Sequence, residues 1–205
     1  MNDKRYAIVG WLAIASAVMM LPTIFLGILL DVLRKPPVLL LLGPYLLFSI
    51  ASTAFSLYAL YRLRGLLNDR FQFHEVDGLI VAIIFCVIAL TSVAMSGKLG
   101  AVLAKAAGVR EAALLPFALI FLGLLVLCGV ATSILSIIFA VKLLRLQDDL
   151  FGLLKPYAYA TMAAAVCFAT VILAPVGLFI DAAATVMLGI IFLRAARGLP
   201  APEFV

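Results

Sequence analysis

The chain has 205 residues, of which 67% are hydrophobic and only 12% are charged. Soluble domains are about half apolar and about a quarter charged, so this composition excludes an ordinary soluble fold and predicts that lipid surrounds most of the chain. The net charge of +5 comes from short basic clusters beside apolar stretches. Such clusters are typical of membrane orientation signals, and we expect no nucleic-acid partner.

The first three predicted helices cover about 6–30, 38–61 and 78–95. A helix of about 20 apolar residues crosses a hydrocarbon core of about 30 Å, so each stretch is long enough to span. The first is too long for a signal-peptide core and has no cleavage site of small residues, so we expect it to be retained. Residues 98–113 carry apolar side chains at helical spacing and predict an interfacial helix or an extension of the third span.

The remaining helices are predicted at about 116–141, 158–174 and 176–193. Pro36 and Pro116 each suit the first turn of the helix that follows, where a missing amide donor is harmless. A single helix over the last apolar region would be about 54 Å long, so a tight hairpin divided at Pro175 is favoured over one kinked helix. The sequence thus predicts an all-α integral membrane protein, a six-helix transmembrane bundle in one domain.

Residues 36–71 align with 116–151 without a gap at a constant offset of 80. The informative matches are polar or conformational, because Leu on Leu is common in any apolar sequence. They include Gly43 with Gly123, Ser52-Thr53 with Thr132-Ser133, Ser56 with Ser136, Arg62 with Lys142, and Asn68-Asp69 with Asp148-Asp149. An even number of spans separates the copies, so this internal repeat is parallel, unlike the inverted repeats of many secondary transporters.

The basic residues predict the orientation of the bundle. In a six-span arrangement, ten of the 15 Lys and Arg residues fall on the side that holds both termini. They are Lys4, Arg5, Arg62, Arg64, Arg70, Lys142, Arg145, Lys155, Arg194 and Arg197. The positive-inside rule therefore places both termini in the cytoplasm, at the cell membrane.

Small residues recur at helical spacing on three predicted spans. They are Ser49, Ser52 and Ser56 on the second, Gly129, Thr132 and Ser136 on the fourth, and Ala165 and Ala169 on the fifth. Membrane helices associate through close backbone approach and a few interhelical hydrogen bonds, so we interpret these as helix-packing faces. A pore lined by the hydroxyl groups is the alternative.

The repeated loops carry the most specific polar feature of the duplication. We predict a cytoplasmic contact surface for a partner at six residues, with helix termination and local ion pairing as the alternative. The six are Asn68, Asp69, Phe71, Asp148, Asp149 and Phe151.

No motif indicates a catalytic, cofactor-binding or metal site, and we expect neither an enzyme nor a bound cofactor. His74, Glu75 and Asp77 could ligate a metal, but no second group of Cys or His completes a site, and Asp77 suits a helix N-cap. Asp31 and Asp181 are expected at span ends, where water reaches them, so we place no ionisable residue at mid-membrane depth.

Three stretches resemble a family of small archaeal multi-pass membrane proteins of unknown function: Gly10 to Pro44, Leu60 to Phe73, and Tyr157 to Arg194. The resemblance implies an archaeal cell membrane and no known activity, and the few Asn and Gln residues agree with a thermophile. Our leading hypothesis is a non-catalytic structural or accessory subunit, packed with itself or with other membrane subunits in the lipid bilayer. The alternatives are a transporter or channel for a small solute or ion and, less favoured, an enzyme using His74, Glu75 and Asp77.

Overall fold

The computed structural model describes residues 3–32, 38–71, 73–108, 111–146, 150–170 and 172–198. Regular structure in these ranges is entirely helical, which confirms the predicted all-α bundle. The helices are α1 (Asp3–Val32), α2 (Val38–Phe71), α3 (Asp77–Ala106), α4 (Glu111–Leu144), α5 (Leu154–Ala169) and α6 (Ala174–Ala196), with short 3-10 helices η1 (His74–Val76) and η2 (Leu150–Gly152). Within the described residues, five helices, all but α5, are long and apolar enough to cross a membrane. The chain is therefore a multi-pass membrane protein.

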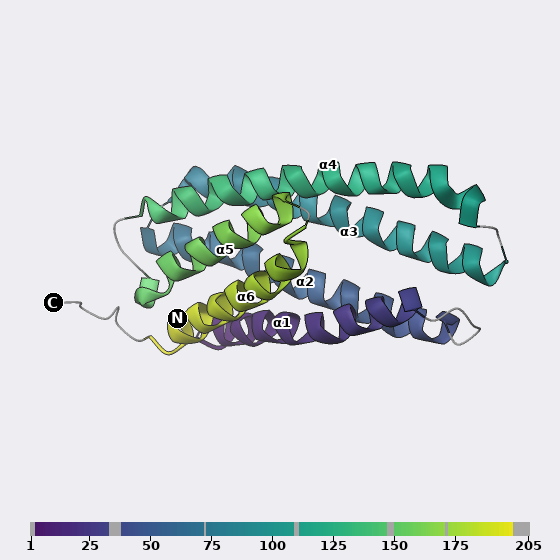
Figure 1. The fold of residues 1–205 in the computed structure, drawn as a ribbon. Coiled ribbons are helices and arrows are strands. Elements are labelled where there is room, and N and C mark those ends of the chain that lie inside the picture. The colour runs from purple at the N-terminus through teal and green to yellow at the C-terminus, as the bar shows by residue number, and fades with distance from the viewer. Residues whose placement is uncertain are drawn as a thin grey trace.

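The helices form a closed ring of contacts. Each helix packs against the next in the chain, and α6 packs against α1. The first residues of α1 and the last residues of α6 lie at one end of the bundle, called here the terminal end, and α1 and α3 finish at the opposite, far end (Figure 1). The two helices of the internal repeat, α2 and α4, run in the same direction from the far end to the terminal end, as a parallel repeat requires.

One helix boundary differs from the prediction, and one open alternative is decided. Residues 98–106 extend α3, the second of the two alternatives for this segment, and Val102 there packs in a buried contact with α1 and α2. Helix α4 begins at Glu111, so Pro116 lies inside it and not in the expected position at its start. Pro36 and residues 109–110 lie outside the described residues.

Helices α5 and α6 form the expected hairpin, but the turn precedes Pro175. Helix α5 ends at Ala169, and Pro175 lies in the first turn of α6. A Cβ at Gly177 would lie 3.0 Å from the Cβ of Cys167, so the two helices approach closely just after the turn. The hairpin rises from the terminal end and stops well short of the far ends of α1 to α4 (Figure 1).

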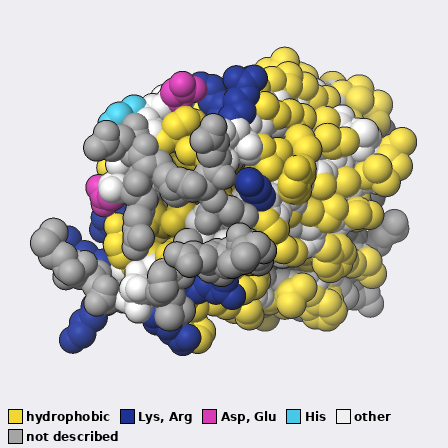
Figure 2. Space-filling model, turned by 90° about the vertical axis from the view of Figure 1, so that its left-hand side faces the viewer, with side chains coloured by type: hydrophobic (Ala, Val, Ile, Leu, Met, Phe, Trp, Pro, Cys, Tyr) yellow, Lys and Arg dark blue, Asp and Glu magenta, His cyan; other side chains and the backbone are white. Residues whose placement is uncertain are grey.

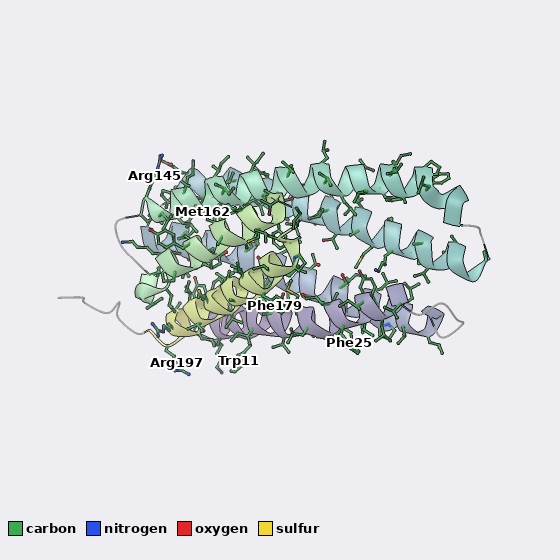
Figure 3. The ribbon with its side chains drawn as sticks, in the orientation of Figure 1. Trp11, Phe25, Arg145, Met162, Phe179 and Arg197 are labelled. Atoms are coloured by element: carbon green, nitrogen blue, oxygen red, sulfur yellow. The ribbon has the colours of Figure 1, made fainter. Side chains whose placement is uncertain are left out.

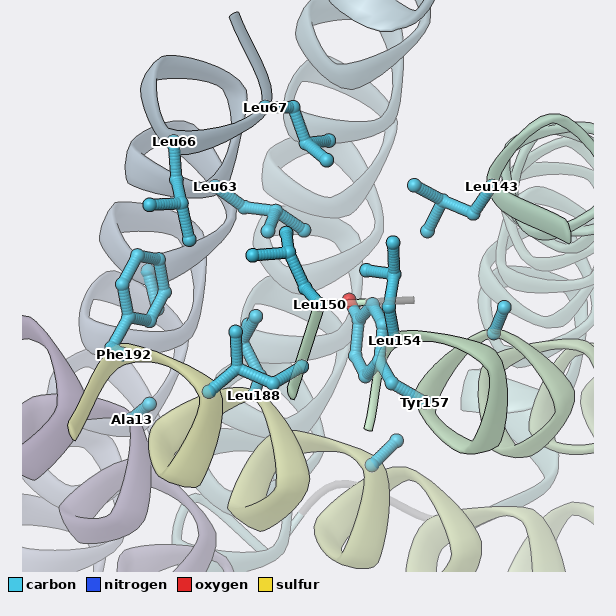
Figure 4. Close-up of a cluster of buried hydrophobic side chains, with 14 of the residues drawn as sticks. Ala13, Leu63, Leu66, Leu67, Leu143, Leu150, Leu154, Tyr157, Leu188 and Phe192 are labelled. Carbon is cyan, nitrogen blue, oxygen red and sulfur yellow. The ribbon is translucent and has the colours of Figure 1, made fainter. Parts of the chain in front are cut away.

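The main hydrophobic core is built mainly from the segments of the helices near the terminal end, and Figure 4 shows part of it. Six large side chains at its centre, each at most 5% exposed, are called here the closing cluster: Leu63, Leu66, Leu143, Leu150, Leu154 and Phe192. They come from α2, α4, η2, α5 and α6. A smaller cluster of Leu30, Leu42 and Val102 joins α1, α2 and α3 near the far end.

The surface is divided between charge at one end and apolar side chains along the flanks. Viewed from the terminal end, Lys, Arg, Asp, Glu and His side chains gather on that face, and hydrophobic side chains cover the adjoining flank (Figure 2). Arg145 and Arg197 lie at the terminal end, whereas Trp11 and Phe25 point outward from α1 (Figure 3). Both of these aromatic side chains are 64% exposed. Such flanks are stable in lipid and not in water.

Candidate functional site

A cavity of about 590 Å³ lies inside the ring, and all six helices contribute to its wall. The volume falls in the range of small-molecule sites, about 300–1,000 Å³. Its lining is rich in hydroxyl groups: Ser16, Thr23, Ser49, Ser52, Thr53, Ser56, Thr91, Thr132, Ser133, Ser136, Tyr157, Thr161 and Thr185. One carboxyl group, that of Asp181, completes the polar part of the wall.

The internal repeat supplies two matching sides of this cavity. Four aligned pairs of the repeat line it: Ser49 with Gly129, Ser52 with Thr132, Thr53 with Ser133 and Ser56 with Ser136. Seven of the eight residues predicted as helix-packing faces therefore border open space, Ala169 being the exception. This is the arrangement expected of the alternative interpretation, in which the hydroxyl groups face an internal space.

Ser52 also joins two helices. The hydroxyl group of Ser16 on α1 donates to the carbonyl oxygen of Ser52 at 2.8 Å, and the hydroxyl group of Ser52 donates to the carbonyl oxygen of Ser16 at 3.0 Å. The hydroxyl group of Thr132 donates within its own helix, to the carbonyl oxygen of Cys128 at 2.8 Å. Only the α2 side of the repeated face is thus fixed to a neighbouring helix by a described side-chain hydrogen bond.

The Ser16–Ser52 pair lies near the middle of two apolar spans, Lys4–Leu30 of α1 and Leu40–Asp69 of α2, and so indicates mid-membrane level. Ser52 lies about 15 Å of helix from Arg62 at the terminal end. This distance is half of the hydrocarbon thickness of about 30 Å.

Asp181 lies at that level, which corrects the expectation that it sits at a span end. Helices α1 and α6 run in opposite directions and meet where Gly10 faces Gly189, because a Cβ at Gly10 would lie 2.8 Å from the carbonyl oxygen of Gly189. From this contact, Asp181 is about 12 Å along α6 and Ala17 about 10 Å along α1 in the same direction. The prediction placed Asp181 at the membrane boundary because we expected the sixth span to begin at the membrane surface.

The Asp181 carboxylate faces the cavity without a counter-charge. Within the described part of the chain, no hydrogen bond or ion pair engages it, and no Lys, Arg or His side chain lines the cavity. Aromatic rings of Phe139, Tyr157 and Phe168 contribute to the same wall. An intramembrane acid is energetically expensive and marks a functional site by default.

The cavity meets the buried core on its terminal side, whereas the α4 part of its wall towards the far end is formed by exposed or half-buried side chains. Tyr157 and Leu188 belong both to its wall and to the buried core that contains the closing cluster. Towards the far end, by contrast, none of the described α4 side chains from Leu115 to Thr132 is buried. Access from the terminal side would require the closing cluster to separate.

The polar residues after α2 form a local network. The carboxylate of Asp77 pairs with Arg64 (Nε to Oδ1, 2.9 Å) and accepts a hydrogen bond from Asn68 Nδ2 at 3.1 Å. His74 lies 3.5 Å from the same carboxylate, and Lys142 lies 3.5 Å from that of Glu75. The described residues contain no group of three His, Cys, Asp or Glu side chains that could hold a metal ion.

The structure divides the predicted contact surface. Asn68 is held by Asp77, and Asp69 accepts a hydrogen bond from the hydroxyl group of Tyr6 at 3.3 Å. The Phe151 side chain is only 3% exposed, so it belongs to the core and not to an exposed surface. Asp148 and Asp149 lie outside the described residues, as does the side chain of Phe71.

Sequence reasoning missed Ser16, Tyr157, Asp181 and Thr185 as members of one site. A weak signal existed, because Asp181 and Thr185 are four residues apart and so share one face of a helix. Such spacing identifies a polar face and leaves open what it meets. No protein-family model matches the chain, and neither a curated protein nor a solved structure shows significant similarity to it. The resemblance to an archaeal family stays a prediction.

Proposed function

We propose that this protein is a membrane transporter for a small solute and that the central cavity is its solute site. The observation that carries this proposal is the position of the cavity. It lies inside a closed ring of helices, at mid-membrane level, with hydroxyl groups and one carboxylate in its wall. Polar groups in the membrane interior are tolerated where they face a cavity or a solute pathway.

The difference in packing between the two ends of the bundle favours a transporter rather than a structural protein with a sealed core. A transporter exposes its site to one side while the other side is shut, and a buried apolar layer is an effective barrier to polar solutes. The closing cluster supplies that layer at the terminal end. The described conformation is therefore assigned as the one that is shut towards the terminal end.

We further propose that the terminal end is cytoplasmic and that the membrane is the cell membrane. Basic residues of five helices meet at this end, and cytoplasmic sides carry an excess of such residues. The described examples are Lys4, Arg5, Arg62, Arg64, Lys142, Arg145, Lys155, Arg194 and Arg197. The site would then face the cell exterior.

Cysteine accessibility tests the proposed function. In a full-length variant without its three native cysteines, Ser49→Cys and Thr132→Cys place a thiol on each repeated face of the cavity. A membrane-impermeant thiol reagent should modify both from the far side in sealed vesicles. Leu127→Cys, on the 69% exposed outer surface of α4, is the matched control and should not react. If neither cavity position reacts from either side, the cavity is not a solute site.

A non-catalytic structural or accessory subunit is the second candidate. It is favoured by the first half of α4, where nearly the whole circumference is exposed, including Leu115, Phe117, Leu119, Ile120 and Leu122. A lateral partner could cover this segment. Cross-linking from Leu119→Cys in native membranes tests it, and a product confined to lipid adducts would count against the subunit role.

A further inference from the structure

We propose that the solute is an organic cation, an amine with an apolar body, and that Asp181 is the counter-ion for its ammonium group. This inference rests on the proposed transport function and names the substrate class of the same cavity. It is argued from the charge of the wall, from the distribution of its apolar side chains, and from the size of the space.

The charge of the cavity wall determines which sign of charge the solute carries. Asp181 is the one charged side chain among the described lining residues. A carboxylate at mid-membrane depth is strongly disfavoured while it lacks a partner, and a bound cation removes much of that penalty. An anion would instead add a second negative charge beside it. Cationic solutes are therefore selected over anionic ones.

The position of hydrogen-bond acceptors extends this selection to an ammonium group. Thr185 lies one helical turn from Asp181 on α6, and both line the cavity. An ammonium group offers several N–H donors, so it can pair with the carboxylate and donate to a hydroxyl oxygen at the same time. The opposed hydroxyl faces of α2 and α4 provide further acceptors across the space.

The apolar part of the wall matches the body of such a molecule. Leu122, Leu125 and Val126 of α4 line the cavity towards the far end, and Phe168 and Leu178 line it near the hairpin turn. An aromatic ring next to a carboxylate also favours a cation by its negative face. A volume of about 590 Å³ is far larger than a single metal ion requires, whereas it accommodates an organic molecule.

Three probes with one aromatic body and different charge test the inference. They are phenethylamine, which is protonated at pH 7, the neutral phenethyl alcohol, and the anion phenylacetate. Binding is measured by equilibrium dialysis on the full-length protein in lipid nanodiscs. We expect the amine to bind about tenfold or more tighter than the alcohol, which corresponds to about 1.4 kcal/mol. Phenylacetate should bind more weakly than both.

The variant Asp181→Asn should abolish the preference for the amine and leave the affinity for the alcohol unchanged. Retained alcohol binding shows that the variant is folded. Glu75→Gln removes the same charge at the terminal end, where Glu75 is exposed, and should leave the preference intact. With Asp181 retained and the three native cysteines removed, a Thr185→Cys thiol should be protected from a thiol reagent by the amine at lower concentration than by the alcohol.

Equal affinity for amine and alcohol, or a preference that survives Asp181→Asn, would overturn the cation assignment while the solute site stands. Absence of binding by all three probes also overturns it. If Ser49→Cys and Thr132→Cys are then unreactive as well, the transport proposal fails with it. The two proposals are thus separated by one set of measurements.

Discussion

Ser16 and Ser52 each donate a side-chain hydrogen bond to the other residue's backbone carbonyl, at 2.8 and 3.0 Å. This reciprocal pair links α1 to α2 at mid-membrane level, in the wall of the cavity. Ser16 is only 3% exposed, so the pair is largely shielded from solvent. The pair therefore combines two roles, since it stabilises a helix contact and holds one hydroxyl face in place.

Replacing Ser16 with Ala should destabilise the bundle by about 1 kcal/mol. Interhelical hydrogen bonds in membranes contribute about 0.6 kcal/mol on average and reach about 1.7 kcal/mol. The Ser16→Ala/Ser52→Ala double variant should lose less than the sum of the single variants, because both bonds belong to one contact. Unfolding by denaturing detergent in mixed micelles measures the change. Ser49→Ala, on the same face of α2, is the control, and an equal loss there would contradict this assignment.

The contact between Gly10 and Gly189 should not tolerate a side chain. An added Cβ at either position would lie 2.8 Å from the carbonyl oxygen of the other glycine. Helices α1 and α6 must then separate, and overpacking of this kind costs about 1–3 kcal/mol. Gly10→Ala should lower stability in the same detergent titration. Gly65→Ala is the matched control, because a Cβ there meets nothing within 4 Å and alanine favours the helix.

Weakening the closing cluster should open the cavity towards the terminal end. Leu150 and Leu154 are 5% and 1% exposed, and truncating a buried Leu to Ala costs about 2–5 kcal/mol. This loss destabilises the shut conformation. Leu154→Ala should therefore increase the population that is open towards the terminal end by about tenfold or more. The measurement is the rate at which an impermeant reagent added from the terminal side modifies a Ser56→Cys thiol. Leu127→Ala, on the lipid-exposed surface, should leave the rate unchanged.

Arg194 should stabilise the turn that precedes α5. Its guanidinium Nη1 donates to the carbonyl oxygen of Phe151 at 2.9 Å, and Phe151 has a left-handed backbone with φ of 57°. This conformation disfavours a residue with a side chain by about 1–2 kcal/mol, so the turn depends on its contacts. Arg194→Ala should lower stability by about 1 kcal/mol. Arg197→Ala, which removes an exposed charge three residues later, should change it by less than about 0.5 kcal/mol.

Hydrophobic length and internal similarity determined the architecture from the sequence. Apolar stretches of spanning length can only be helical in lipid, because every backbone polar group must be paired within its own helix. The offset of 80 located two equivalent helices, and the basic residues indicated that both termini share one side. Each of these features is either local to one stretch of residues or a sum over residues, so it can be read from a single sequence.

The boundaries of the hairpin were less predictable. Pro175 marked the division between two helices, but a proline in a first turn follows the true turn by several residues. The choice between a separate interfacial helix and a longer α3 likewise depends on Val102, which packs against Leu30 and Leu42 of other helices. Such contacts join residues far apart in the chain, and a local pattern does not contain them.

The sequence by itself determined a membrane bundle with a repeated face of small hydroxyl residues. Only the tertiary structure decided that these faces surround an open space and that Asp181 joins them at mid-membrane depth. The physical reason is that a serine or threonine face can pack against a helix or border a cavity equally well. The choice depends on how closely the facing helices approach, and here the ring of six helices, with a hairpin shorter than its neighbours, holds them apart.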